Sequence, residues 1–216
     1  GTAGNQFGQL GNASTTALSS TTTAVPVSGT ALTNSATSYV VQVVAGTDFT
    51  CALRNDGAVY CWGLNSSGQV GDGTIINKSV PTAVSGLGTA SGVVSLTAGA
   101  QHACALKATG ETVCWGANGS GQLGDGSTSQ RTSPVVVSGT TGGSTIVALS
   151  AGSAHTCAVR WDGTASCWGA NTTSGILGAN SSIATNQSSP QAVQWSSGVT
   201  DNPNLRPQMC SKYSIP

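Results

Sequence analysis

The chain has 216 residues, a length that fits one large domain or part of a repeat array. Only 6% of the residues are charged, 30 are glycine, and seven Lys and Arg balance seven Asp and Glu. This neutral composition argues against a partner that is bound through clustered positive charge, such as a nucleic acid or an anionic membrane surface.

The N-terminal segment precedes the regular part of the chain. It opens at Gly1 with neither Met nor a signal-peptide pattern, so we expect a processed or partial product. Residues 4–11 match a Gly-Gln-Leu-Gly loop that recurs later, which predicts the loop of a preceding repeat. Residues 13–38 are rich in Ser and Thr and low in complexity, which predicts a long surface loop.

A repeat with a period of 53 residues follows. The triplet Cys-Trp-Gly begins at Cys61, Cys114 and Cys167. Each unit holds an apolar run, a Cys-containing segment, the Cys-Trp-Gly segment, a Gly-rich loop and a short Pro-containing segment, in that order. Short β-branched runs between turn residues predict strands, and four strands per unit at this period favour propeller blades over a helical solenoid. The predicted fold class is therefore all-β, with blades of four antiparallel strands.

The strand count predicts a partial propeller. We expect three complete blades at about residues 25–62, 81–115 and 134–168, each opened by the Pro-containing strand. Residues 190–195 then supply a lone strand, so the repeat region covers 1–195 and a non-repeat tail covers 196–216. Exposed strand edges of such an arc need cover, either from the rest of a longer chain or from other copies of this chain.

The hairpin inside each unit predicts three disulfides. A three-residue loop at Asn55, Asp56 and Gly57 places Cys51 directly opposite Cys61. The same rule pairs Cys104 with Cys114 and Cys157 with Cys167. A non-hydrogen-bonded pair of this kind has a Cα separation of about 4.5 Å, which suits a disulfide and implies an oxidising compartment. A buried thiol pair in a reducing cell and a zinc site are the alternatives.

These motifs resemble a known family. The order His-x-Cys-Ala-Leu, Asp-Gly, Cys-Trp-Gly and Gly-x-Asn-x-x-Gly-Gln-Leu-Gly-Asp-Gly is similar to the repeat of the regulator of chromosome condensation 1 (RCC1) propellers. The cysteine-bearing form resembles the one common in secreted bacterial proteins. The resemblance covers residues 1–195 and implies a closed β-propeller, usually of seven blades, from which this chain departs in length.

Three residues outside the repeat pattern are candidates for contacts with partners. Cys210 has no partner by the hairpin rule, which predicts either an intermolecular bridge or a free thiol. Trp161 and Trp195 lie out of register with the repeated tryptophans Trp62, Trp115 and Trp168, which we expect in the blade core. Trp161, at a hairpin tip, is the better candidate for partner contact.

No catalytic, metal-binding or cofactor-binding set emerges. His102 and His155 are equivalent, but the first unit has Phe49 there, so we expect buried packing with one hydrogen bond. Glu111 is the only Glu, and Asp72 and Asp125 have the pattern of residues that close a turn through their own backbone.

The function we expect is that of a non-catalytic extracellular structural or interaction protein. A cell-surface, appendage or filament subunit that self-associates through propeller edges fits best, without nucleic acid, membrane insertion, metal or cofactor. The alternative is a protein-binding or glycan-binding propeller module, adhesin-like or inhibitor-like. GTPase exchange, the role of the family's nuclear member, and hydrolysis are less favoured, because no residues here match an exchange insertion or an acid/base pair.

Overall fold

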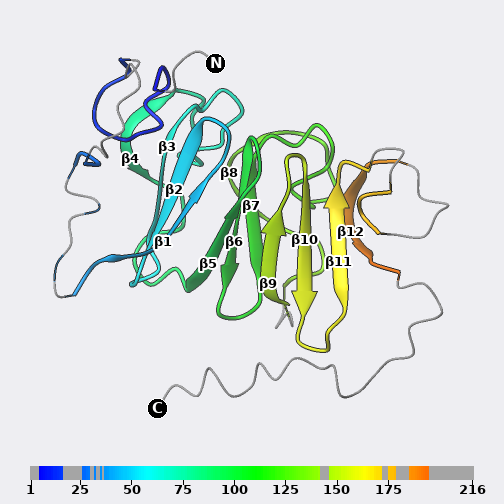
Figure 1. Ribbon diagram of the computed structural model, residues 1–216. Helices are drawn as coiled ribbons and strands as arrows, with labels where there is room; N and C mark the ends of the chain where they lie inside the picture. Colours follow the sequence, from blue (N-terminus) through cyan, green and yellow to red (C-terminus); the bar gives the residue numbers. More distant parts are fainter. Residues whose placement is uncertain are drawn as a thin grey trace.

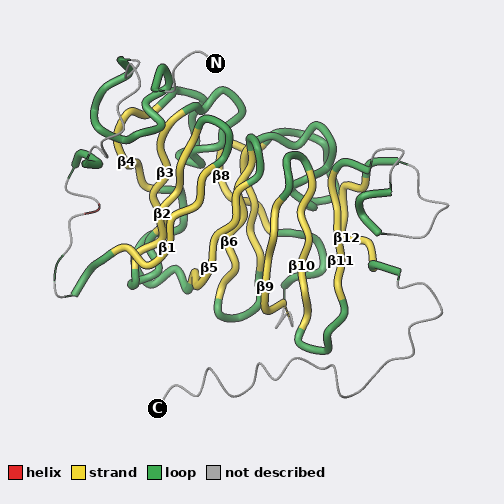
Figure 2. The backbone as a smooth tube through the Cα atoms, viewed as in Figure 1, coloured by secondary structure: helices red, strands yellow, loops and turns green. Residues whose placement is uncertain are grey.

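The structure is a computed structural model, and it describes residues 5–16, 26–29, 32, 35, 37–141, 146–171, 175–178 and 185–194. Within these ranges the named elements are twelve β-strands, and no helix is long and apolar enough to cross a membrane. The strands form three four-stranded antiparallel sheets that stand side by side in chain order (Figures 1 and 2). The predicted all-β blade architecture is confirmed, and the sheets are called blades 1, 2 and 3.

The bounds of the strands repeat closely from blade to blade. Blade 1 consists of β1 (Val40–Ala45), β2 (Phe49–Arg54), β3 (Val59–Gly63) and β4 (Lys78–Ala83). Blade 2 consists of β5 (Val93–Ala98), β6 (His102–Lys107), β7 (Thr112–Gly116) and β8 (Arg131–Val136). Blade 3 consists of β9 (Ile146–Ala151), β10 (His155–Arg160), β11 (Ala165–Gly169) and β12 (Gln187–Ala192). In each blade the spatial order follows the chain order.

The fourth strand of each blade corrects the expected blade boundaries. β4, β8 and β12 pair with the Cys-Trp-Gly strand that precedes them, so they complete that blade and do not open the next one. The boundaries 25–62, 81–115 and 134–168 are therefore wrong. The lone strand expected at 190–195 is wrong as well, because β12 completes blade 3. The long glycine-rich loop turns each chain segment back onto the strand it has just left.

The proline of each fourth strand lies in a bulge inside the strand and does not start it, as the pairing register shows. Cys61 pairs with Thr82 and Gly63 pairs with Lys78, so two extra residues bulge out on β4 around Pro81. β8 and β12 have the same irregularity around Pro134 and Pro190. A bulge accepts proline because its residues need not donate to the ladder.

The second and third strands form the predicted hairpins. Arg54 N donates to Ala58 O at 2.9 Å, and Gly57 has a φ of 86° in the left-handed region. This turn places Cys51 opposite Cys61. The three disulfides expected from this register, Cys51–Cys61, Cys104–Cys114 and Cys157–Cys167, are present, each with a Cα–Cα distance of 4.1 Å.

The first strands of the blades contact one another along one side of the stack. Each contains a bulge, at Val41, Val94 and Val147. The Gln42 side chain bridges two of these strands, because its Nε2 donates to Leu96 O at 3.0 Å and its Oε1 accepts from Leu96 N at 2.8 Å. Neighbouring blades are thus joined by directed hydrogen bonds as well as by apolar packing.

The hairpin disulfide should contribute measurably to stability. Replacing both Cys104 and Cys114 by alanine should lower the free energy of unfolding by about 3 kcal/mol, because the cross-link constrains a short loop of the unfolded chain. Denaturant unfolding of the oxidised protein measures this loss. The wild-type chain with all disulfides reduced is the control and should lose more, whereas an unchanged midpoint for the double variant would contradict the prediction.

Candidate functional site

The two interfaces between blades bury the disulfides of blades 1 and 2. One apolar cluster joins Phe49, Cys51 and Leu53 of blade 1 to Ala105 and Trp115 of blade 2. A second cluster repeats this arrangement between blades 2 and 3. Each blade therefore has a forward face, which carries the disulfide, and a rear face, which carries the tryptophan of Cys-Trp-Gly. The forward faces of blades 1 and 2 meet the rear face of the next blade. We use these two names below.

A glycine-rich loop reaches from each blade to the rear face of the next. Trp115 Nε1 donates to the carbonyl of Gln69 at 3.0 Å. A Cβ on Gly68 would lie 2.7 Å from the Cα of Thr132, and one on Gly71 would lie 2.8 Å from Trp115 Nε1. Contacts this close leave no space for a side chain, so the glycines of the Gly-Gln-Leu-Gly motif are required by the interface.

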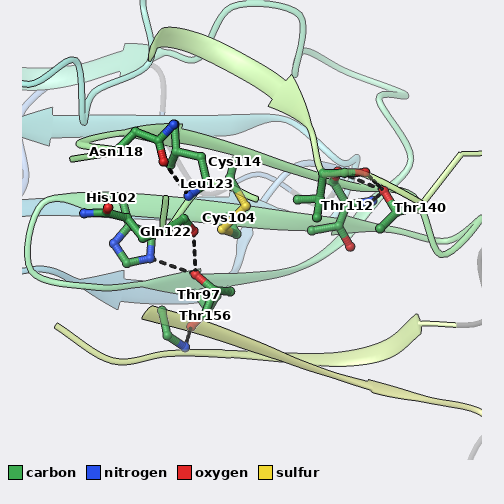
Figure 3. Close-up of a disulfide and its surroundings, with 12 residues drawn as sticks. Thr97, His102, Cys104, Thr112, Cys114, Asn118, Gln122, Leu123, Thr140 and Thr156 are labelled. Atoms are coloured by element: carbon green, nitrogen blue, oxygen red, sulfur yellow. Dashed lines mark hydrogen bonds between the residues drawn. A yellow bond between two sulfur atoms is a disulfide. The ribbon is translucent and has the colours of Figure 1, made fainter. Parts of the chain in front are cut away.

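A buried asparagine holds each loop in shape. Asn118 is 1% exposed, and its Nδ2 donates to the carbonyls of Ser127 at 3.1 Å and Ser129 at 3.0 Å. Its Oδ1 accepts a hydrogen bond from Leu123 N at 3.0 Å (Figure 3). Asn65 does the same in the loop of blade 1. The repeated Asn is therefore a structural residue of the loop.

The loop aspartates close turns, as expected from sequence. Asp125 accepts from Ser127 N at 3.0 Å and forms an ion pair with Arg131 at 2.7 Å. Burial on its own would raise the pKa of Asp125, but the hydrogen bonds from Ser127 and Arg131 outweigh it and hold the pKa below its ordinary value. Asp72 is placed in the same way with Thr74 and Lys78. The carboxylates are thus occupied by the chain itself.

A polar chain crosses the interface of blades 2 and 3. Thr156 Oγ1 donates to the carbonyl of Gln122 at 2.9 Å, so its oxygen is left to accept from His102 Nε2 at 3.0 Å (Figure 3). The neutral tautomer with a proton on Nε2 follows from this network. His102 is fully buried, and its Nδ1 has no hydrogen-bond partner among the described residues. Burial, with a smaller effect from the charge of His155, lowers the pKa of His102 to about 4.

Each first strand ends at the Ala of an Ala-Gly pair, whose glycines are Gly46, Gly99 and Gly152. The packing of the aromatic ring at the position of His102 requires this glycine. A Cβ on Gly99 would collide with the ring of His102 and with the backbone carbonyl of Gly152 in the next blade. Gly46 meets the ring of Phe49 and the carbonyl of Gly99 in the equivalent way. For Gly152 the three nearest atoms all belong to the ring of its own His155. The aromatic ring at this position therefore packs on bare backbone.

The forward face of blade 3 has no covering blade in the described part of the chain. Val159 is 41% exposed, whereas the equivalent residues Leu53 and Leu106 are 2% and 3% exposed. The His155 ring, equivalent to His102, has no hydrogen-bond partner in the described part of the chain. Cys157 is partly exposed, while the cysteines of the other two blades are fully buried. This face has the side chains of an interface without a neighbour among the described residues.

Comparison with models of known protein families identifies the family of the repeat. A model of the regulator of chromosome condensation (RCC1) repeat matches residues 2–53, 56–106 and 110–159. A second RCC1 repeat model matches residues 40–69, 93–122 and 146–175, which begin at the first residues of β1, β5 and β9. The chain belongs to the RCC1 repeat family. The family resemblance stated from the sequence is confirmed at this level.

Several proteins of known name are similar in sequence. The chain is 36% identical to the E3 ubiquitin-protein ligase HERC2 of Homo sapiens over 119 residues, which are 55% of this chain and 2% of that protein. It is 32% identical to the ultraviolet-B receptor UVR8 of Arabidopsis thaliana over 133 residues, which are 61% of this chain and 30% of the receptor. The chain thus spans less than a third of either relative.

Solved structures show the same fold. Human WBSCR16 matches with a TM-score of 0.72 and 24% identity, over 88% of this chain and 46% of that one. Prp20p of Saccharomyces cerevisiae matches with a TM-score of 0.61 and 23% identity, over 76% of this chain and 38% of that one. The work on Prp20p describes binding to Gsp1p and histones. These similarities establish an RCC1-like propeller arrangement of blades.

The tryptophans singled out from the sequence of this RCC1-repeat chain lie in different environments. Trp62, Trp115 and Trp168 are buried, at 3%, 0% and 0% exposure. Trp161 lies at the tip of the β10–β11 hairpin and is 70% exposed. Trp195, Cys210 and the tail 196–216 lie outside the described residues. No group of three or more metal-binding side chains occurs in the part of the chain that the structure describes.

Sequence reasoning missed the polar contacts between blades. Thr156 follows His155 in the chain yet contacts His102, which lies 54 residues before it. The positions equivalent to Thr156 hold Thr50 and Ala103, so the repeat itself gave no steady signal there. No sequence signal marks Thr156, because its bond to the Gln122 carbonyl depends on the docked loop, as does the bond from Thr50 Oγ1 to the carbonyl of Gln9.

Acid should destabilise the protein through His102. Its pKa is 6.5 in the unfolded chain and about 4 in the fold, so between these values the unfolded state binds more protons. The stabilisation is complete above pH 6.5 and is lost as the pH falls toward 4, by up to about 3 kcal/mol. Urea unfolding at several pH values measures this slope. His102→Phe, which copies Phe49, should flatten it, and an equal slope in that variant would argue against His102 as the source.

The three disulfides should differ in their reaction with reductant. In the folded protein a low concentration of a dithiol should reduce Cys157–Cys167 first, because a thiolate can reach the partly exposed Cys157. Alkylation followed by peptide mass spectrometry identifies the reduced pair. The chain unfolded in denaturant is the control, in which the three pairs should react alike. Equal rates in the folded protein would mean that blade 3 is covered.

Proposed function

We propose that this chain is a non-catalytic protein-interaction module that works in an oxidising, extracellular setting, and that it docks through the forward face of blade 3. One observation carries the proposal. Val159 is 41% exposed at a position where Leu53 and Leu106 are almost fully buried by the next blade. Apolar side chains held open on a rigid sheet favour a protein partner, because burying them is the main favourable contribution to protein association.

Three features support the extracellular setting. Each blade is cross-linked by a disulfide, and such bonds are rare in compartments where thiols are kept reduced. The cysteine-bearing repeat resembles the secreted bacterial form of the family. The near-absence of charge fits a structural role, as a cell-surface, appendage or filament subunit. Alkylation of the chain at its natural source before any reduction tests this setting, and free thiols at Cys51 and Cys61 would refute it.

A second candidate function is a protein- or glycan-binding module that uses the hairpin tip. Trp161 is 70% exposed there, and an exposed aromatic ring offers a flat apolar surface to a sugar or a side chain. The binding of Prp20p to Gsp1p and histones supports a protein ligand for a related propeller. The two candidates place the partner on different residues of blade 3, so single substitutions distinguish them.

The experiment is a display library of extracellular protein fragments selected on the oxidised full chain. Binders should lose at least about tenfold in affinity on Val159→Glu, since a charge would be buried without a partner. Val147→Glu is the matched control, because Val147 is 47% exposed on the first strand of the same blade. Binders lost only on Trp161→Ala would favour the hairpin tip. A selection without any binder sensitive to Val159→Glu would contradict docking through the forward face.

A further inference from the structure

The segment 5–16 docks on the rear face of blade 1 as the other loops dock on blades 2 and 3. Trp62 Nε1 donates to the carbonyl of Gln9 at 2.9 Å, the counterpart of Trp115 and Gln69. A Cβ on Gly8 would lie 2.5 Å from the Cα of Ser79, as close as the equivalent glycines come to β8 and β12. Ala13 N also donates to Ser79 O at 2.9 Å. Segment 5–16 thus holds the position of a loop from a preceding blade.

The remainder of that rear face lacks a covering sheet among the described residues. Val43 is 58% exposed, whereas Leu96, the equivalent residue of blade 2, is 4% exposed under blade 1. The rear face of blade 1 is therefore occupied at its loop end and open over its first strand.

The opposite end of the stack has the complementary feature. Gly175 is the counterpart of Gly8, Gly68 and Gly121, each of which approaches the outer strand of a following blade. A Cβ on Gly175 would meet nothing within 4 Å. Gly178, the counterpart of Gly11, approaches only Val193 of its own blade and no tryptophan. The loop of blade 3 thus has the glycines for a close contact that it does not make with any described residue.

We propose that copies of this chain associate head to tail, with the forward face of blade 3 on the rear face of blade 1 of a second copy, and that segment 5–16 restrains this association. The inference rests on the proposed docking role of blade 3 and names its partner as a second copy. The two interfaces inside the chain already join a forward face to a rear face. The same contact between copies continues that series, provided that residues 175–178 of one copy replace residues 8–11 of the next.

The balance of contacts explains why the segment acts as a restraint. Exchange of one loop for the other would keep a hydrogen bond from Trp62 Nε1 to a loop carbonyl, with Ile176 in the place of Gln9. It would lose the bond from Gln9 Nε2 to Asp48 Oδ1 at 3.4 Å. The gain is the burial of Val43 and Val159, which are 58% and 41% exposed in the single chain. Segment 5–16 competes from within the same chain, at an effective concentration that can reach the millimolar range for a short tether. A substitution that weakens the contact of segment 5–16 with blade 1 should therefore shift the chain toward association.

A matched pair of glycine substitutions tests the proposal on the full oxidised chain. Gly8 and Gly175 both have a positive φ, of 79° and 64°, which asparagine tolerates. Gly8→Asn should expel segment 5–16, because its Cβ would collide with the backbone of Ser79, and should raise the association constant at least about tenfold in sedimentation velocity. Gly175→Asn should leave the single chain folded and abolish association, since its side chain stands in the way of a second copy.

The double variant separates head-to-tail growth from unspecific aggregation. Chains with both substitutions accept a neighbour but cannot donate, so a small fraction of them added to Gly8→Asn should shorten its assemblies. Deletion of residues 1–16 should reproduce the Gly8→Asn result by a second route. Monomers at all concentrations for both releasing variants, or assemblies that ignore Gly175→Asn, would overturn self-association. Binders sensitive to Val159→Glu in the display selection would still leave the proposed function standing.

Discussion

The contact between a glycine loop and the next tryptophan holds the stack together. The carbonyl of Gln69 accepts from Trp115 Nε1 while Gly68 and Gly71 bring the loop backbone against blade 2. A sheet of four short strands has two apolar faces and cannot bury both alone, so the loop that leaves one blade must reach the next. The long return loop serves this contact and brings the fourth strand back to its own blade. The period of the sequence is the distance along the chain from one such contact to the next.

Neutral groups make the polar contacts inside this stack. The side chains of Asn118, His102 and Thr156 cross or close the interfaces without a net charge, and the pKa of His102 is lowered far enough to keep it neutral near pH 7. A buried unpaired charge would cost far more than an amide or a hydroxyl with a partner. The low content of charged residues and the abundance of Ser, Thr and Asn have a physical reason in these interfaces. The open faces therefore carry few charges as well, so that two such faces would not repel each other strongly.

The two ends of the stack differ in a way that bears on function. Trp62 of blade 1 donates to a carbonyl of segment 5–16, whereas Gly175 in the loop of blade 3 has no close neighbour among the described residues. The filament expected from sequence needs both ends to be available, and the structure occupies one of them at its loop end. In the association that we propose, two loops compete for the same rear face. Regulation by a segment of the same chain needs no separate switch residue.

The sequence alone determined the features that depend on a few neighbouring residues. Turn chemistry at Gly57 fixes the hairpin register, and the register places Cys51 opposite Cys61, so the disulfides follow from a span of eleven residues. The family resemblance rested on the same local motifs. Tertiary structure decided which sheet contains the Pro-containing strand. By sequence, β4 could complete blade 1 or open blade 2, and only the docked loop selects blade 1. It also decided that His102 contacts Thr156 and that Gly175 has no close neighbour among the residues the structure describes, because these outcomes depend on the placement of residues from different blades.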